Sequence, residues 1–181
     1  VERGEPWPEH NYGSDDEANL VIFNEHQGLS WEAVQNMIEE TYARIDAYLD
    51  RTSEATLLSV PEGQGDGQDS PIWRGIAGSY IMHPAIHLWE YLRQHGYGAD
   101  VLVLFGDAYT DRLLALDDSD GWRGGVYYNQ ACLQALSGMK ETAIETLGEA
   151  LRLQPRLIEW SRQDSDLASL RDDPAYQALY D

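Results

Sequence analysis

The sequence is poor in several residue types that define protein classes. Its 181 residues include a single cysteine, Cys132, so no disulfide can form within the chain. Only 12 residues are lysine or arginine, against 32 that are aspartate or glutamate, which gives a formal net charge of −20. Because phosphate contacts need clustered basic side chains, this balance argues against a nucleic-acid partner and against an anionic membrane surface.

Long apolar runs are also missing. No segment approaches the length of a membrane-spanning helix, and we expect no signal peptide. We therefore expect a cytoplasmic protein with no membrane partner. The chain begins at Val1 with the segment VERGEPWPEH, which is typical of residues that follow the end of a helix. We therefore expect further residues before Val1.

What the chain has is enough apolar material for a core. Hydrophobic residues make up 43% of it, with six tryptophans and eleven tyrosines. The acidic charge is uneven, because residues 1–70 carry a net charge of −13 and residues 71–181 a net charge of −7. A globular protein with an acidic, soluble surface follows from these values.

Nearly every periodic segment has helical spacing, which predicts an all-α fold. Ser14 and Glu17 fit a capping box at the start of a short helix, and Ser30 caps a longer helix that begins at Trp31. That longer helix carries an apolar stripe that we expect to face a core: Val34, Met37, Ile38, Tyr42, Ile45 and Leu49. We expect its acidic residues to be solvated: Glu32, Glu39, Glu40 and Asp46.

The middle of the chain predicts a loop over residues 61–71 and then a helix from Ile72 that Pro84 interrupts. A further helix is expected over residues 100–116. The polar, glycine-containing segment 117–125 is expected to be a linker.

Residues 126–155 resemble a single tetratricopeptide repeat (TPR), a hairpin of two helices. Ala131 and Ala143 are small where the two helices would meet, Gly138 stands at the turn, and Pro155 ends the second helix. Gln130 and Gln134 depart from the pattern, where leucine and tyrosine are usual. Cys132 lies in the apolar part of the first helix and is expected to be a small core residue rather than a nucleophile.

One repeat cannot bury its own apolar face. The helix over residues 100–116 is expected to cover one side. The segment after Pro155 is expected to cap the other, with Leu157, Ile158 and Trp160 followed by Leu167, Leu170, Tyr176 and Leu179.

Five histidines are present, and only His83 and His87 form a group. On a continuous helix they share one face, and two imidazoles at this spacing can chelate one divalent ion. Glu90 could join them or orient one ring. The alternative is a purely structural role, in which His83 caps a helix and His87 is a partly buried packing residue. His10, His26 and His95 are weaker candidates.

The arrangement from Trp7 to Leu92 resembles the DinB-like family of helical bundles. The matching features are the helix around Asn19, the segment SWEAVQNMIEETYARIDAYL, and a last helix that carries His83 and His87. The resemblance implies a divalent ion (Zn, Ni or Mn) held by three histidines, of which the third would precede Val1 unless His10 or His26 replaces it. It implies a hydrolase or thiol transferase acting on small molecules, with the metal ion activating water or a thiolate.

The sequence thus predicts a partial DinB-like bundle over residues 1–98, then a single TPR-like hairpin with capping helices over residues 99–181. Two functions stay open. One is a metal-binding protein with His83 and His87 as ligands, in which catalysis is uncertain. The other is a non-catalytic interaction module that binds a protein partner through the hairpin. A homodimer formed through the bundle helices is a further option.

Overall fold

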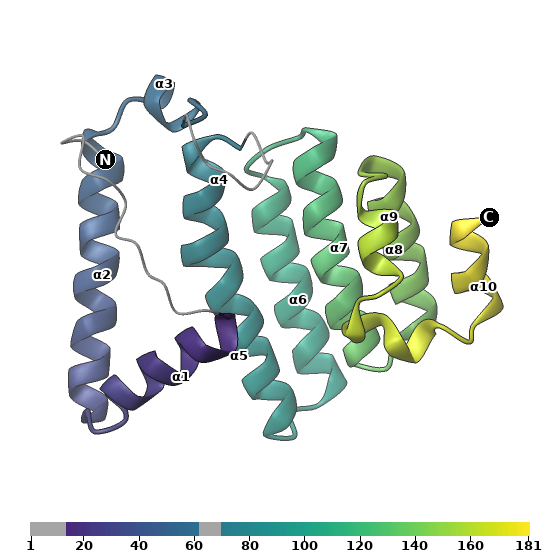
Figure 1. Ribbon diagram of the computed structural model, residues 1–181, viewed down its shortest axis with the longest axis horizontal. Coiled ribbons are helices and arrows are strands. Elements are labelled where there is room, and N and C mark those ends of the chain that lie inside the picture. The colour runs from purple at the N-terminus through teal and green to yellow at the C-terminus, as the bar shows by residue number, and fades with distance from the viewer. Residues whose placement is uncertain (1–13, 62–69) are drawn as a thin grey trace. The chain divides into compact units, whose positions relative to one another are not determined.

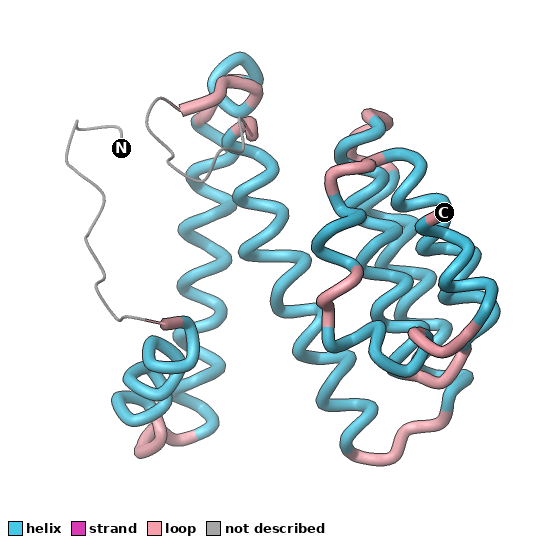
Figure 2. Tube along the Cα trace, turned by 45° about the vertical axis from the view of Figure 1, so that its right-hand side comes forward, coloured by secondary structure: helices cyan, strands magenta, loops and turns pink. Residues whose placement is uncertain are grey.

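The computed structural model describes residues 14–61 and 70–181, and within these ranges the protein is all-α. Ten α-helices and no strand occur in the described residues, which confirms the predicted fold class (Figures 1 and 2). The chain divides into two compact units, Val1–Ile72 and Trp73–Asp181. No helix in the described part of the chain is long and apolar enough to cross a membrane.

The first unit contains three helices: α1 (Asp15–His26), α2 (Trp31–Arg51) and α3 (Glu54–Leu57). The predicted caps are present. The Ser14 hydroxyl accepts from the Glu17 N–H while the Glu17 side chain accepts from the Ser14 N–H, and the Ser30 hydroxyl accepts from the Ala33 N–H. These bonds satisfy amide groups that have no partner within the helix. The loop predicted after α3 lies almost entirely outside the described residues.

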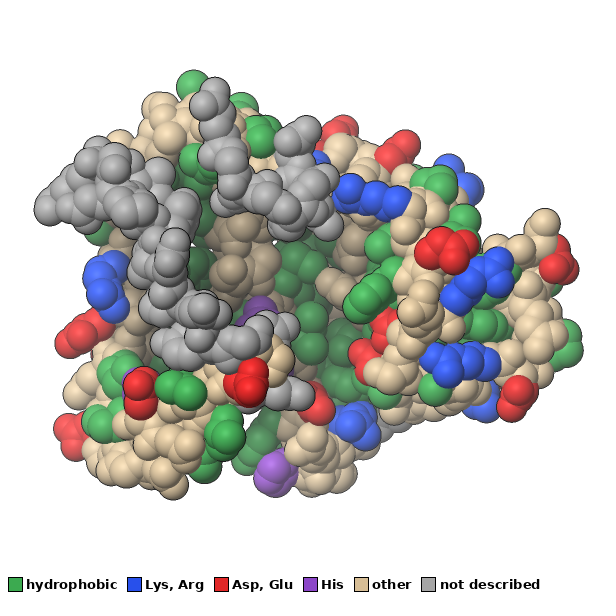
Figure 3. All heavy atoms as spheres, viewed as in Figure 1, with side chains coloured by type: hydrophobic (Ala, Val, Ile, Leu, Met, Phe, Trp, Pro, Cys, Tyr) green, Lys and Arg blue, Asp and Glu red, His purple; other side chains and the backbone are tan. Residues whose placement is uncertain are grey.

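The α2 stripe does not face a core, and that prediction was wrong. None of the described residues of the first unit is buried, and Met37, Ile38 and Leu49 remain 37–48% exposed. A helical stripe becomes a core only when a second apolar layer covers it. The same exposure holds for α1, where hydrophobic side chains reach the molecular surface (Figure 3). The acidic residues of α2 are exposed, as predicted.

The second unit holds every buried residue in the described part of the chain. Its α5, α6, α7 and α8 stand side by side, each antiparallel to the next (Figure 1). Its helices and helical turns are, in order, α4 (Ile72–Ala77), the π-helical turn η1 (Gly78–Met82), α5 (His83–Gln94), α6 (Ala99–Leu114), α7 (Asp120–Leu136), α8 (Lys140–Leu153), α9 (Leu157–Ser161), the 3₁₀ turn η2 (Ser165–Leu170), α10 (Pro174–Gln177) and the 3₁₀ turn η3 (Ala178–Tyr180).

The hairpin of α7 and α8 confirms the predicted helix–turn–helix. Gly138 has φ +81° at the turn, a left-handed conformation that glycine adopts without a steric cost. Ala131, Ala143 and Leu147 are completely buried between the helices and their cover. The second helix ends at Leu153, two residues before Pro155.

The hairpin is longer than predicted, because the expected linker is largely helical. α7 begins at Asp120 and includes Gly124. A side chain at position 124 would lie 2.7 Å from Cβ of Gln154 and 3.3 Å from the carbonyl oxygen of Ala150. Gly124 therefore permits close approach of α7 to the end of α8, and the glycine that suggested a linker is a packing residue.

Both sides of the hairpin are covered, as predicted. The C-terminal segment places Leu167, Leu170 and Tyr176 in the hairpin core. On the other side, Leu113 of α6 joins Trp122 and Val126 of α7 in a second cluster, and a third cluster joins α5, α6 and α7 through Trp89, Leu102 and Leu133. Trp160 was expected to help cover the hairpin but is 63% exposed.

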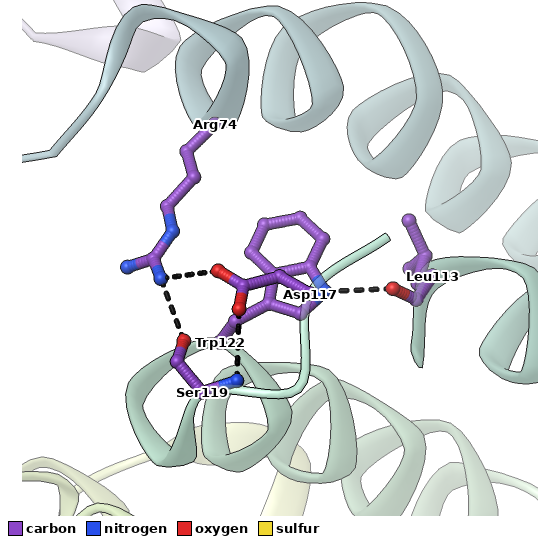
Figure 4. A network of polar contacts seen from close by, with 5 residues as sticks. All are labelled: Arg74, Leu113, Asp117, Ser119 and Trp122. Atoms are coloured by element: carbon purple, nitrogen blue, oxygen red, sulfur yellow. Dashed lines mark hydrogen bonds and ion pairs between the residues drawn. The ribbon is translucent and has the colours of Figure 1, made fainter. Parts of the chain in front are cut away.

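A polar bracket fastens α4 to the segment between α6 and α7 (Figure 4). The Arg74 guanidinium donates to Oδ2 of Asp117 and to Oγ of Ser119, both at 2.7 Å. The Trp122 indole N–H donates to the Leu113 carbonyl, also at 2.7 Å. Desolvation alone would raise the pKa of Asp117, but the hydrogen bonds from Arg74 and Ser119 outweigh it and lower the pKa.

Candidate functional site

His83 and His87 lie one turn apart at the start of α5, and their rings meet. Their Nε2 atoms are 3.1 Å apart, and the ring planes are nearly perpendicular. In the neutral state one Nε2–H can donate to the other Nε2. Two Nε2 atoms bound to one tetrahedral zinc ion would be separated by about 3.3 Å, so the observed spacing also suits chelation.

Pro84 does not separate the two rings. It lies in the first turn of α5, where its missing N–H has little cost. The π-helical turn η1 precedes it, and the His83 N–H bonds to the Gly78 carbonyl five residues back. This wider turn accommodates proline where a regular helix would clash with its ring.

Glu90 extends the histidine pair along α5. Its Oε2 lies 3.7 Å from Nδ1 of His87, too far for a hydrogen bond, and Gln94 donates to its Oε1 at 3.3 Å. The side chains of His87 and Glu90 are 61% and 46% exposed. The three side chains thus form a polar surface group rather than an enclosed pocket.

His26 and His95 each contact a carbonyl group of their own helix. Nδ1 of His26 lies 2.7 Å from the Ile22 carbonyl oxygen of its own helix, and Nδ1 of His95 lies 2.8 Å from the Tyr91 carbonyl oxygen. His95 also stacks on the Tyr91 ring. His10 lies outside the described residues.

A second group of ligand-type side chains lies where α7 meets η2. The Cys132 thiol and the carboxylates of Asp164 and Asp166 have atoms within 4.8 Å of one another, and such a group could hold a metal ion. Asp164 is already engaged. Its Oδ2 accepts from the Tyr128 hydroxyl at 2.6 Å and from the Cys132 thiol at 3.9 Å, and its Oδ1 accepts from the Asp166 N–H.

The electrostatics differ between the members of this group. Burial, followed by the charges of Asp164 and Asp166, raises the pKa of the Cys132 thiol far above its usual value. A thiol that stays protonated is a poor nucleophile, so the expected core role of Cys132 agrees with its environment. Burial and the hydrogen bond to Asp164 raise the pKa of Tyr128 in the same way.

Asp166 has the least compensated charge. Its pKa is raised first by desolvation and then by the negative charges of Asp164 and Glu90, while Arg93 acts in the opposite direction. No hydrogen bond or ion pair to its carboxylate is found among the residues that the structure describes. Glu90 and Arg93 belong to α5. Charged side chains of α5 therefore act electrostatically on Asp166, which belongs to the group on α7 and η2.

The sequence did not reveal the second group because Cys132 lies 32 residues before Asp164 and 34 before Asp166. The segment QDSD could be read only as a turn, since Asp164 caps η2 by accepting from the Asp166 N–H. One signal was available. The segment that follows a helical hairpin and caps it packs against the first helix of that hairpin. Residues after position 160 are therefore expected beside α7.

Comparison of the chain with protein-family models, with curated proteins and with solved structures gave no match. The resemblances to DinB-like bundles and to TPRs therefore rest on the sequence motifs, and neither family is confirmed. The packed hairpin of α7 and α8 is the part of those expectations that the structure contains.

Proposed function

We propose that the protein is a non-catalytic interaction module in which the α7–α8 hairpin and its cap bind a basic segment of a partner protein. The observation that carries this proposal is Asp166, a partly buried carboxylate that forms no hydrogen bond or ion pair with the residues that the structure describes. Desolvation, and then the negative charges of Asp164 and Glu90, raise the pKa of this carboxyl.

A lysine or arginine side chain from a partner would offset these negative charges. The positive group would interact with the carboxylates of Asp166, Asp164 and Glu90. The Tyr128 hydroxyl and the Cys132 thiol, which donate to Asp164, would hold its carboxylate in place. Carboxylates whose repulsion is relieved only in a complex are a source of specificity for a cationic partner. The net charge of −20 would add a long-range attraction that accelerates association.

An oligolysine peptide tests this proposal with the full chain, with an oligoglutamate peptide as the negative probe. Titration calorimetry should show that Asp166→Asn weakens oligolysine binding several-fold. The matched variant Asp172→Asn removes the same charge from an exposed position beyond η2, and it should bind like the parent. Equal loss in both variants would mean that net charge alone attracts the peptide, and the assigned site would be wrong.

A second candidate is metal binding, which the 3.1 Å separation of the His83 and His87 Nε2 atoms favours. In this reading the protein belongs with DinB-like metal-dependent hydrolases or thiol transferases. The two histidines would be ligands, and Glu90 would be a third ligand or would orient His87. The group of Cys132, Asp164 and Asp166 is a second donor set for the same class of ion.

Titration with Zn²⁺, Ni²⁺ and Mn²⁺ separates the two donor sets. If the histidines hold the ion, His87→Ala should abolish binding while Cys132→Ser leaves it intact, and the reverse pattern would assign the ion to the second group. The metal candidate fails if no ion binds and neither variant changes the titration.

A further inference from the structure

The apolar stripe of α2 has no buried member, although its spacing is that of a helix that packs against another helix. Ile38 and Ile45 lie near its centre, and Met37 and Leu49 widen it. These side chains remain partly exposed to water, so packing a second apolar stripe against them would favour association.

The two edges of the stripe differ in charge. Glu32, Glu39 and Asp46 recur every seven residues and therefore line one edge. Arg44 and Arg51, also seven residues apart, lie beyond the opposite edge. The acidic side chains are exposed, and no ion pair of these three carboxylates is found in the described ranges of the chain. The α2 face, defined as the apolar side chains of Val34, Met37, Ile38, Ile45 and Leu49 with this acidic edge, is thus apolar with a negatively charged border.

We propose that the α2 face binds an amphipathic helix of a partner protein that carries a row of lysine or arginine residues beside its own apolar stripe. The apolar side chains would pack between the two helices, and the basic row would lie along Glu32, Glu39 and Asp46. Helix-on-helix docking of this kind takes its affinity from apolar anchors and its selectivity from the flanking charges.

A second copy of this chain fits the α2 face less well. Antiparallel pairing would set one acidic edge against the other. Parallel pairing would need the arginine edge, but Arg44 already donates to the Glu40 carbonyl and to the Thr41 hydroxyl, and Arg51 lies over the Tyr48 ring. Each copy also carries a net charge of −20, so pairing adds repulsion. The inference concerns the first unit and does not rest on the function proposed for the hairpin.

Two synthetic helical peptides of about 20 residues test the proposal with the full chain. Both carry the same leucine stripe, and one has lysine where the other has glutamate at the flanking positions. Fluorescence anisotropy should give a Kd for the lysine peptide at least about tenfold lower than for the glutamate peptide, and added salt should narrow the difference. Equal affinity for the two peptides, or no binding of either, would overturn the proposal.

Charge reversal at exposed positions provides the decisive variant, because it leaves the apolar packing intact. Glu39→Lys combined with Asp46→Lys should reverse the preference between the two peptides. Asn36→Lys combined with Ala43→Lys adds lysines on the opposite face of α2, and this pair should keep the preference for the lysine peptide. Light scattering should show a monomer. A dimer that Ile38→Asp dissociates would assign the α2 face to a second copy and contradict the proposal.

Discussion

The two units of the chain use similar amphipathic helices with opposite results. In the second unit, α7 and α8 bury alanine and leucine side chains completely beneath a C-terminal cap. In the first unit, α2 has a comparable stripe but no described residue is buried. The difference shows that periodicity establishes which face of a helix is apolar, whereas burial depends on a neighbour that the helix itself does not specify.

The largest expected effect compares one leucine of the hairpin core with one isoleucine of α2. Leu147→Ala should lower the free energy of unfolding by about 2–5 kcal/mol, because it leaves a cavity at a completely buried position. Ile38→Ala, at a half-exposed position, should cost less than about 1 kcal/mol. Urea denaturation monitored by circular dichroism measures both. Equal costs would remove the contrast between the units.

A glycine pair within α7 sharpens the account of the second unit. Gly124→Ala should destabilise the protein by about 1–3 kcal/mol, since the new Cβ would collide with Cβ of Gln154. Gly121→Ala adds a methyl group in open space on the same helix and should be neutral or stabilise by up to about 1 kcal/mol. Thermal melts of the two variants should therefore shift in opposite directions or differ clearly in size.

The bracket around Asp117 predicts a dependence on pH. Because the pKa of Asp117 is lowered in the folded protein, its contribution is present above the unfolded pKa of about 3.9 and is lost as the pH falls through the folded value. Asp117→Asn should cost about 1 kcal/mol at pH 7. Denaturation curves at pH 7 and at low pH should show the gap between variant and parent closing. A gap that persists in acid would assign the loss to packing.

Asp166 predicts the smallest effect, with the opposite sign. Its pKa is raised by desolvation and by the charges of Asp164 and Glu90, so its ionised form destabilises the folded state above the folded pKa. Asp166→Asn should slightly stabilise the protein at neutral pH, and the gain should vanish as the pH falls below the unfolded pKa. Differential scanning calorimetry across pH tests this. A loss of stability at pH 7 would show that Asp166 is a structural residue.

Sequence reasoning predicted the local features of the fold, because caps, turns and breakers act over a few residues. The Ser14–Glu17 capping box, the turn at Gly138 and the covered hairpin are all present. Segment 117–125 was misjudged because a glycine that allows close helix packing looks the same in sequence as one that loosens a linker. The site on α7 and η2 was missed because Asp166 and Cys132 meet only after the chain has folded back.

Histidines 83 and 87 illustrate the remaining limit. Their spacing predicts a shared helical face, and the structure places their Nε2 atoms 3.1 Å apart. The same spacing serves a hydrogen bond between neutral rings and chelation of an ion. Chelation of an ion requires further ligand side chains near the two histidines. Residue spacing along α5 does not reveal side chains that come from other parts of the chain.

Hydrogen exchange of the full chain, followed by mass spectrometry, tests the central contrast most directly. Amides of α7 and α8 should exchange slowly, because their helices open only with the buried core. Amides of α2 should exchange faster by roughly two orders of magnitude, the ratio given by a difference of about 2.8 kcal/mol in opening free energy. The lysine-flanked peptide should slow exchange in α2. Protection of α2 equal to that of α8 in the free protein would contradict the account, because the α2 stripe would then already be buried.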